Sequence, residues 1–519
     1  MSLRKIINSD LFWICLLAIL SLAIQFFAYK PLGFHRDEFL YLALGRHLDT
    51  GYWSNPPLIG IISAIAQLLP GDPLFATRFF PALAGAVLVI LTGLISKEIG
   101  GKRFAQLFAC IGLISCILFL RGYSMLQPVP FDILFWTLAL YLLLKYINTE
   151  KPLFILLLGT TFGLGILNKY NVIFLASGIV IAILLTKHRE LFKKSYFWFA
   201  LLIAFVLFIP NLLWQVHYHF PVVGHMSELN RNQLVHVHRL NILTDQFFMF
   251  FGSSILWFPG LLWLLFAAKA KEYRVFGLIY LAVIGIYVLL RGKSYYAAGL
   301  YPFFLAAGAI FWDNLFKRSY PKIIILDIVL FLNMLLIPNG IPIFNTQGLV
   351  KYYSGMSKRT GNNVATRWED GRSHPLPQDY ADMLGWDELA NLVIKACDTI
   401  QDKHRIMIYG ENYGQAGSVD FYTRSHGYEP VISFSDSYLM WAPDSITEKK
   451  KIFVYVNDEM GNDVKRLFSQ IDSVGSITNK YAREYGTSVY LCRNPRADFS
   501  KFWAARVRQV KAERFRSSE

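Results

Sequence analysis

The sequence predicts a polytopic α-helical membrane protein with about 11 transmembrane helices and a soluble α/β domain at its C-terminal end. Of the 519 residues, 54% are hydrophobic and only 17% are charged, whereas soluble proteins carry about a quarter of charged residues. Apolar runs of about 20 residues, the length that crosses a bilayer, recur from Leu11 to about Ile337. From about Pro342 onward the chain is ordinarily polar. These observations exclude a single soluble domain, a fibre and a disordered chain.

The spans follow in order along the first two thirds of the chain. Sustained apolar stretches predict them at residues 11–28, 76–96, 104–120, 131–146, 153–167, 172–185, 195–216, 247–268, 275–290, 297–312 and 323–337. A further apolar stretch at residues 58–69 is too short to cross a bilayer and predicts a helix at the membrane surface. The transmembrane domain is therefore expected to cover residues 1–340.

The placement of charge orients these spans. The net charge of +15 comes largely from Lys and Arg residues in short loops near residues 97–103, 187–194, 269–274 and 317–322. Loops of this kind face the cytoplasm under the positive-inside rule. The N-terminus is then cytoplasmic, and the segments 29–57 and 217–245, with everything after Pro338, lie on the outer side. Because the membrane accounts for the basic charge, we expect no nucleic-acid partner.

The polar remainder, residues 341–519, predicts an extracytoplasmic α/β domain with a basic tail. Short runs rich in Ile, Val, Phe and Tyr indicate strands at residues 404–409, 430–434, 451–456 and 487–492. The spacing of apolar residues indicates helices at residues 386–400 and 463–471. The tail after Phe499 carries six Lys and Arg residues between Lys501 and Arg516. It is either a solvated helix or a segment that contacts anionic lipid headgroups.

Ionisable residues at the ends of the spans are the candidates for chemistry, because membrane helices tolerate charge mainly where it is paired or functional. Asp37 and Glu38 follow the first span, and Asp132 lies one residue into a later one. Basic and phenolic residues occur at the same outer level: Arg121, Lys169, Arg291, Lys293, Tyr295 and Tyr296. Helix capping and snorkelling toward water are the structural alternatives. The shared level favours one polar cavity at the outer membrane surface.

Acids beside isolated cations indicate a division of labour at such a cavity. The cations would hold a phosphate, and a carboxylate would deprotonate an incoming hydroxyl. This chemistry fits glycosyl transfer from a lipid-linked sugar phosphate. We take Asp37, Glu38 and Asp132 as candidate catalytic residues. The candidates for the donor phosphate are Lys169, Lys293, Arg121, Arg291 and Tyr295, and those for substrate contact are Asn55, Glu228 and Tyr296.

The same residues carry a resemblance to a known family. Asp37-Glu38, followed by Gly51-Tyr52-Trp53-Ser54-Asn55-Pro56-Pro57-Leu58, resembles the first outer loop of glycosyltransferase family 39. That family includes the protein O-mannosyltransferases and the lipid A aminoarabinose transferases, which share the GT-C membrane fold. The similarity covers roughly residues 10–340, and the later stretch from Arg291 to Tyr296, leading to Tyr301-Pro302, also resembles the family. Residues 412–416 resemble a segment of bacterial members with an outer domain.

The resemblance implies roles for individual residues. Asp37 matches the family's catalytic base, and Asp132 matches its second acid. Lys169 matches a lysine that contacts the lipid phosphate in the aminoarabinose transferases. Those enzymes have Glu-Lys before the paired prolines where this chain has Ser54-Asn55, a departure that counts against their donor and their metal site.

The expected protein is an inverting glycosyltransferase of the bacterial inner membrane. Its donor would be a sugar on a polyprenyl phosphate, and its acceptor an envelope glycan, lipid or protein on the periplasmic side. The alternative is a flippase or transporter of lipid-linked sugars that performs no transfer chemistry. The long outer loops and the charges gathered at one face favour the enzyme.

Histidines in the loop after Trp214 raise the question of a metal. His217, His219, His225, His236 and His238 include two His-x-His pairs, which are possible zinc ligands. The alternative is an ordered polar loop at the mouth of the cavity. The sequence requires no cofactor, and a divalent metal stays open, with His217 and His219 as its candidates.

Overall fold

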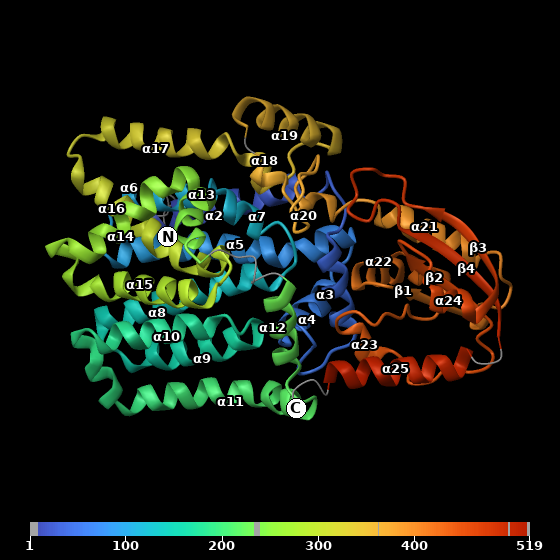
Figure 1. Cartoon of the computed structure of the whole chain (residues 1–519). Helices are drawn as coiled ribbons and strands as arrows, with labels where there is room; N and C mark the ends of the chain where they lie inside the picture. The colour runs from blue at the N-terminus through green and yellow to red at the C-terminus, as the bar shows by residue number, and fades with distance from the viewer. Residues whose placement is uncertain (1–8, 233–238, 362, 497–498, 516–519) are drawn as a thin grey trace.

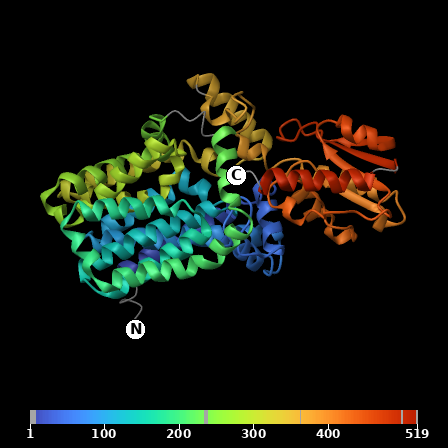
Figure 2. The same cartoon turned by 60° about the horizontal axis from the view of Figure 1, so that its bottom comes forward.

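The structure is a computed structural model that describes residues 9–232, 239–361, 363–496 and 499–515. A body of long, roughly parallel helices makes up one end of the molecule, and a four-stranded sheet with its covering helices makes up the other (Figures 1 and 2). The short helices α3 (Arg36–Arg46) and α4 (Leu58–Ala66) lie between the two parts (Figure 1). The first outer loop of the sequence therefore forms the junction.

The helical body contains the predicted spans. Its helices are α2 (Asp10–Ala28), α5 (Pro73–Glu98), α6 (Arg103–Ile114), α7 (Ile117–Gly122), α8 (Pro128–Thr149), α9 (Pro152–Asn168), α10 (Val172–Leu184), α11 (Ser195–His217), α12 (Pro221–Asn232), α13 (Asn241–Phe250), α14 (Ser254–Phe266), α15 (Arg274–Leu290), α16 (Tyr301–Leu315) and α17 (Ser319–Met334). Among the described residues, seven helical segments are long and apolar enough to cross a membrane, or eight if the bent pair Val172–Leu184 and Lys187–Lys193 counts as one. The polytopic helical class is confirmed, but the count of eleven is not.

Several predicted spans are shorter or more broken than hydropathy indicates. The stretch expected at residues 104–120 is divided between α6 and α7, and α9 and α17 have 17 and 16 residues. An α-helix rises about 1.5 Å per residue, so such helices fall short of a bilayer's hydrocarbon thickness when taken alone. Spans are predicted from hydropathy averaged over many neighbouring residues, and such an average does not detect breaks of this kind.

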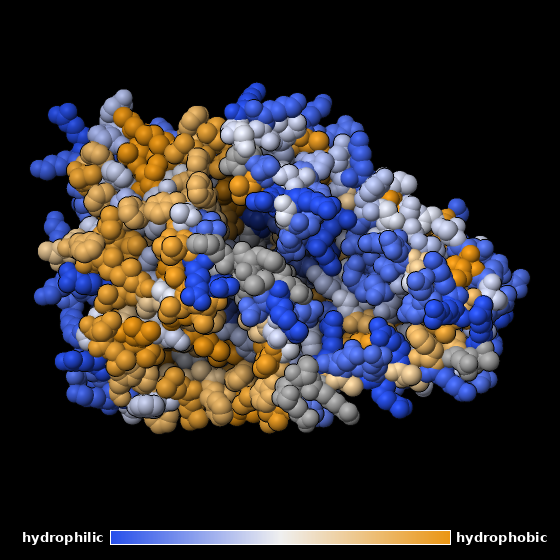
Figure 3. Space-filling model, viewed as in Figure 1, coloured by the Kyte–Doolittle hydropathy of each residue, from blue (hydrophilic) through white to orange (hydrophobic). Residues whose placement is uncertain are grey.

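The surface of the helical body is that of a protein in contact with lipid. Hydrophobic residues cover most of it, whereas hydrophilic residues gather at its far edge and over the sheet domain (Figure 3). In α2 and in α11, only 22% of the most apolar 18-residue stretch is buried inside the protein. Large side chains such as Phe27, Phe199 and Phe205 are exposed. Exposed apolar surface on this scale requires a non-aqueous partner, here the bilayer.

The C-terminal part, called the outer domain after its expected side of the membrane, is a small mixed α/β domain, as expected. Its strands β1 (Ile406–Gly410), β2 (Ile452–Asn457), β3 (Phe468–Ser476) and β4 (Ser488–Pro495) lie in the order β1-β2-β4-β3. β1 and β2 are parallel, with Ile408 opposite Val454, and β4 is antiparallel to both of its neighbours. The remaining helices are α18 (Ile337–Gly340), α19 (Thr346–Thr360), α20 (Gln378–Ala381), α21 (Trp386–Cys397), α22 (Tyr413–Thr423), α23 (Tyr438–Trp441), α24 (Asn462–Leu467) and α25 (Phe499–Phe515).

Two local expectations in this domain are wrong. Residues 430–434 form no named strand and contribute one isolated bridge, between Ile432 and Tyr409. Residues 463–471 are only partly helical, because the chain leaves α24 at Leu467 and continues as β3. Pairing with β4 buries Phe468 and satisfies the backbone of this edge strand, and this tertiary pairing overrides the helical spacing.

The outer domain is packed onto α3 by α22, which lies between α3 and the sheet (Figure 1). Gly417 of α22 faces Phe39 so closely that a Cβ at this glycine would lie 2.8 Å from the Phe39 Cβ. An ion pair between Arg46 and Asp420, 2.5 Å long, fixes the other end of α3. The outer domain is thus held against α3, whose first turn contains Asp37.

Candidate active site

The start of α3 sets the orientation of the two neighbouring carboxylates. His35 is the N-cap: its Nδ1 accepts from the Asp37 N–H at 3.2 Å, and its own N–H donates to Glu38 Oε2 at 2.8 Å. This reciprocal capping box satisfies two backbone donors of the first turn. Successive residues of a helix point about 100° apart, so Asp37 faces a cavity while Glu38 points into the protein.

Glu38 is fully buried, with 0% of its side chain exposed. Arg78 binds it with two hydrogen bonds, Nε to Oε1 at 3.1 Å and Nη2 to Oε2 at 2.8 Å. The Leu126 N–H also donates to Oε1 at 3.1 Å. A buried charge paired in this bidentate manner is a structural element. Glu38 does not line the cavity, whereas the neighbouring Asp37 does.

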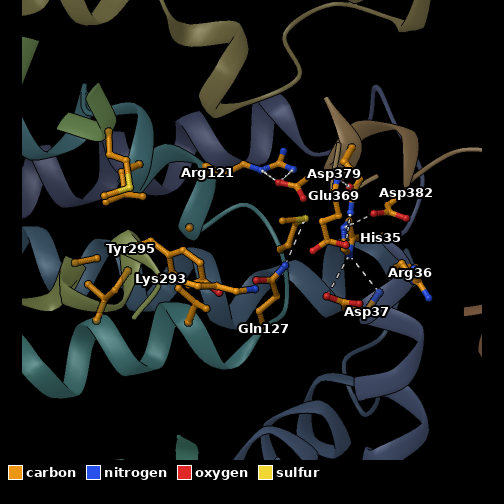
Figure 4. Close-up of a pocket in the computed structure, with 18 of the residues that line it drawn as sticks. His35, Arg36, Asp37, Arg121, Gln127, Lys293, Tyr295, Glu369, Asp379 and Asp382 are labelled. Carbon is orange, nitrogen blue, oxygen red and sulfur yellow. Dashed lines mark hydrogen bonds and ion pairs between the residues drawn. The ribbon is translucent and has the colours of Figure 1, made fainter. Parts of the chain in front are cut away.

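A cavity of about 690 Å³ lies where the helical body meets the outer domain. Four sequence-predicted residues line it: Asp37, Arg121, Lys293 and Tyr295. Residues of the outer part complete it, namely Glu369, Gln378, Asp379, Asp382, Tyr413 and Arg483. Lys293 and Arg121 reach in from the helical side, and the side chains of His35, Asp379 and Asp382 lie opposite them (Figure 4).

The cations of the helical side are held differently from each other. Arg121, at the end of α7, pairs with Asp379 at 2.7 Å and lies over the Tyr380 ring, 4.6 Å from its centroid. Lys293 is half-buried and precedes the short 3-10 helix η5 (Ser294–Leu300). Burial lowers the pKa of Lys293, although the carboxylates of Glu369 and Asp37 oppose this effect. A partly desolvated ammonium group in a cavity is well suited to bind an anion.

The outer domain supplies an acidic wall. Asp382 is buried, 3.0 Å from Arg483 and 3.9 Å from His35 Nε2. Burial raises the pKa of Asp382, against the opposing charges of His35 and Arg483. Sequence reasoning missed Asp379, Asp382 and Arg483, because nothing local in the polar region indicates that these residues face the membrane domain. The one available signal was the segment 412–416, which contains Tyr413.

A second cluster of polar residues lies behind Tyr295, which forms part of the cavity wall. Asp132 accepts a hydrogen bond from Asn171 Nδ2 at 2.8 Å, and Asn171 accepts one from the Tyr287 hydroxyl at 2.6 Å. The Lys169 ammonium lies 4.6 Å from the centroid of the Tyr296 ring and 5.6 Å from that of Tyr295. These residues are neighbours, as their common position at the ends of the spans predicts. Asp132, Lys169 and Tyr296 do not themselves line the cavity.

The remaining candidates lie elsewhere. Arg291 ends α15 in a left-handed conformation, Asn55 bonds Ser54 in the first outer loop, and Glu228 is exposed on α12. His217 and His219 are exposed at the end of α11, whereas His236 and His238 fall outside the described residues. Within the described residues, no group of three or more His, Cys, Asp or Glu side chains could hold a metal ion.

The fold matches that of a solved protein structure. The crystal structure of ArnT from Cupriavidus metallidurans bound to undecaprenyl phosphate aligns with 92% of this chain and 98% of its own, with a TM-score of 0.62 and 14% identity. The apo structure of the same protein aligns equally well, with a TM-score of 0.62. At this level of identity the likeness establishes the fold.

Sequence comparisons find similarity over part of the chain. Residues 54–214 match the family model described as dolichyl-phosphate-mannose-protein mannosyltransferase. The lipid A galacturonosyltransferase RgtD of Rhizobium johnstonii is 28% identical over 214 residues, or 38% of this chain and 43% of RgtD. An uncharacterised protein of Aquifex aeolicus is 30% identical over 147 residues, or 28% of this chain and 29% of its own length. The chain thus matches less than half the length of these relatives.

Together, these findings show a likeness to the GT-C membrane glycosyltransferases. The resemblance of this chain to glycosyltransferase family 39 is confirmed as a resemblance, in fold over 92% of the chain and in sequence over residues 54–214.

Proposed function

We propose that the protein is an inverting glycosyltransferase that moves a sugar from a polyprenyl-phosphate donor to an envelope acceptor on the outer side of the bacterial inner membrane. One observation carries the proposal: the Asp37 carboxylate and the Lys293 and Arg121 cations line the same cavity, where the helical body meets the outer domain. A base and a phosphate-binding group in one cavity are what glycosyl transfer from a sugar phosphate requires.

Asp37 is the base in this proposal. Its side chain is 30% exposed, so an acceptor hydroxyl can reach it, whereas Glu38 is enclosed. The acceptor oxygen attacks the anomeric carbon and forms the new glycosidic bond as its proton passes to Asp37. The bond between the anomeric carbon and the phosphate oxygen breaks on the opposite face, so the configuration inverts and polyprenyl phosphate leaves with the bonding electrons.

Lys293 and Arg121 hold the donor phosphate. The leaving phosphate gains negative charge as the bond breaks, so cations placed beside it stabilise the transition state more than the bound donor. Tyr295 lies in the same wall, with Lys169 behind its ring, and we assign both to the binding of the donor. The likeness to ArnT, whose structure holds undecaprenyl phosphate, supports a polyprenyl carrier.

The test is the release of polyprenyl phosphate by purified protein supplied with a polyprenyl-phosphate sugar and a crude envelope fraction. We expect release that depends on the envelope fraction, with the sugar recovered on the acceptor. The competing function is transbilayer movement of an intact lipid-linked sugar. Wild-type protein that moves the donor across liposomes without cleaving it would contradict the proposal.

A further inference from the structure

Tyr413 of the outer domain reaches the carboxylate to which we assign the catalytic proton transfer. Its hydroxyl donates a hydrogen bond to Asp37 Oδ1 at 2.7 Å, although the two residues are 376 positions apart. Burial, and next the charge of Asp37, raise the pKa of Tyr413 well above its ordinary value. The phenol therefore stays protonated and remains the donor.

The position of Tyr413 is fixed from both sides. It opens α22, where the Asn412 side chain accepts from the N–H groups of Gly414 at 2.9 Å and Gln415 at 3.0 Å. The side chain of Gln415 donates in turn to Glu484 at 2.8 Å. On the other side, the Arg36 guanidinium lies 4.6 Å from the centroid of the Tyr413 ring. A capped helix start and a cation–π contact therefore hold the phenol in place.

The hydrogen bond from Tyr413 gives the two carboxylate oxygens of Asp37 different roles. Oδ1 accepts from Tyr413. Oδ2 lies 3.9 Å from His35 Nδ1, a distance too long for a hydrogen bond. Oδ2 is thus the oxygen placed to receive a proton from the acceptor. The titratable and charged groups that face Asp37 are His35, Arg36, Tyr41, Lys293, Asp382 and Tyr413.

We propose that Tyr413 is a positioning residue through which the outer domain completes the active site: it holds the Asp37 carboxylate in the orientation that proton abstraction requires. This inference rests on the proposed role of Asp37 as the base. Tyr413 does not take part in proton transfer, since its hydroxyl bonds the oxygen that is not engaged by the acceptor. The outer domain is accordingly required for turnover.

The expected effects follow from the strength of a hydrogen bond to an ionised group. Loss of such a bond changes an equilibrium by about 10- to 100-fold. In Tyr413→Phe, kcat should fall by about 10- to 100-fold while the KM for the polyprenyl-phosphate sugar stays the same, because the carboxylate loses its fixed orientation and the donor site is unchanged.

The experiment compares full-length wild type, Tyr413→Phe and the control Tyr485→Phe in the polyprenyl phosphate release assay, with kcat and KM measured separately. Tyr485 is an exposed tyrosine of the same domain, and its variant should match wild type. Should Tyr413→Phe fold poorly, 3-fluorotyrosine at position 413 retains the hydrogen-bond donor and should keep kcat within a few-fold of wild type. Wild-type kcat in Tyr413→Phe, or a loss of about 10-fold or more with 3-fluorotyrosine, would overturn the inference.

A further variant separates this inference from the proposed function. If Asp37→Asn loses transfer while Tyr413→Phe keeps the wild-type kcat, Asp37 remains the base and only the role of Tyr413 fails. If Asp37→Asn retains transfer, the assignment of the base fails, and the inference about Tyr413 fails with it.

Discussion

At the scale of single residues, adjacent carboxylates have opposite environments. Asp37 and Glu38 are equivalent in the sequence, where only their position after a span indicates chemistry. The difference between them comes from Arg78, which binds Glu38 across 40 positions of chain, and from Tyr413, which binds Asp37. Long-range partners of this kind leave no local pattern, so the sequence predicts the pair but not its division of roles.

Lys293 gives a pH dependence at this scale. Because burial lowers its pKa, its positive charge is fully present at low pH and is lost as the pH rises, at a lower pH than for an ordinary lysine of pKa about 10.4. The affinity for polyprenyl phosphate, measured by calorimetry in detergent, should therefore fall at alkaline pH. Lys293→Arg, whose guanidinium stays charged, should keep its affinity over the same range. An equal alkaline loss in that variant would show that another group titrates.

At the scale of elements, the sequence predicts well which segments are helices and strands. It predicts less well which of these elements pack against each other. It predicts α21 and the strands β1, β2 and β4 to within a few residues, since their hydrophobic patterns are local. It misses β3, because the apolar residues Val464, Leu467, Phe468 and Ile471 also fit helical spacing. It does not predict the contact of α22 with α3, which depends on a small residue, Gly417, opposite Phe39.

This contact can be tested by adding one methyl group. In Gly417→Ala the new Cβ would lie 2.8 Å from the Phe39 Cβ, so α22 must move away from α3. We expect a loss of about 1–3 kcal/mol in stability and a lower transfer rate, because Tyr413 lies on the same helix. The control Gly355→Ala in α19 has no atom within 4 Å of its Cβ and should gain up to about 1 kcal/mol. Thermal unfolding in detergent that ranks the two variants in the opposite order would contradict this packing argument.

At the scale of the whole molecule, the cavity belongs to neither part alone. The helical body contributes Arg121 and Lys293, the junction helix α3 contributes Asp37, and the outer domain contributes Asp379, Asp382 and Tyr413. The sequence predicts a membrane domain and an outer α/β domain, and it locates half of the cavity from charges at the ends of spans. The sequence does not predict the other half, because composition does not indicate how a polar domain docks onto a membrane domain.

The orientation of the molecule in the membrane is a prediction at this scale. The basic loops predict that Ser195, at the start of α11, and Ser445, in the outer domain, lie on opposite sides. Both residues are exposed, Cys110, Cys116, Cys397 and Cys492 are buried, and Cys15 is half-buried in the apolar helix α2, so the native background should be low. A membrane-impermeant maleimide should label Ser445→Cys in intact spheroplasts, and Ser195→Cys only after permeabilisation. Labelling of both from the outside would contradict the topology.

The central claim, that Asp37 performs the chemistry while the cations hold the donor, is tested most directly by measuring binding and turnover separately in Asp37→Asn. Loss of a positioned base costs about 10²- to 10⁴-fold in rate, so turnover should fall by that factor while affinity for the polyprenyl-phosphate sugar and thermal stability stay near wild type. Glu38→Gln is the matched control, and it should lose stability because Arg78 is left with an incompletely paired buried charge. Turnover of Asp37→Asn within a few-fold of wild type would contradict the account.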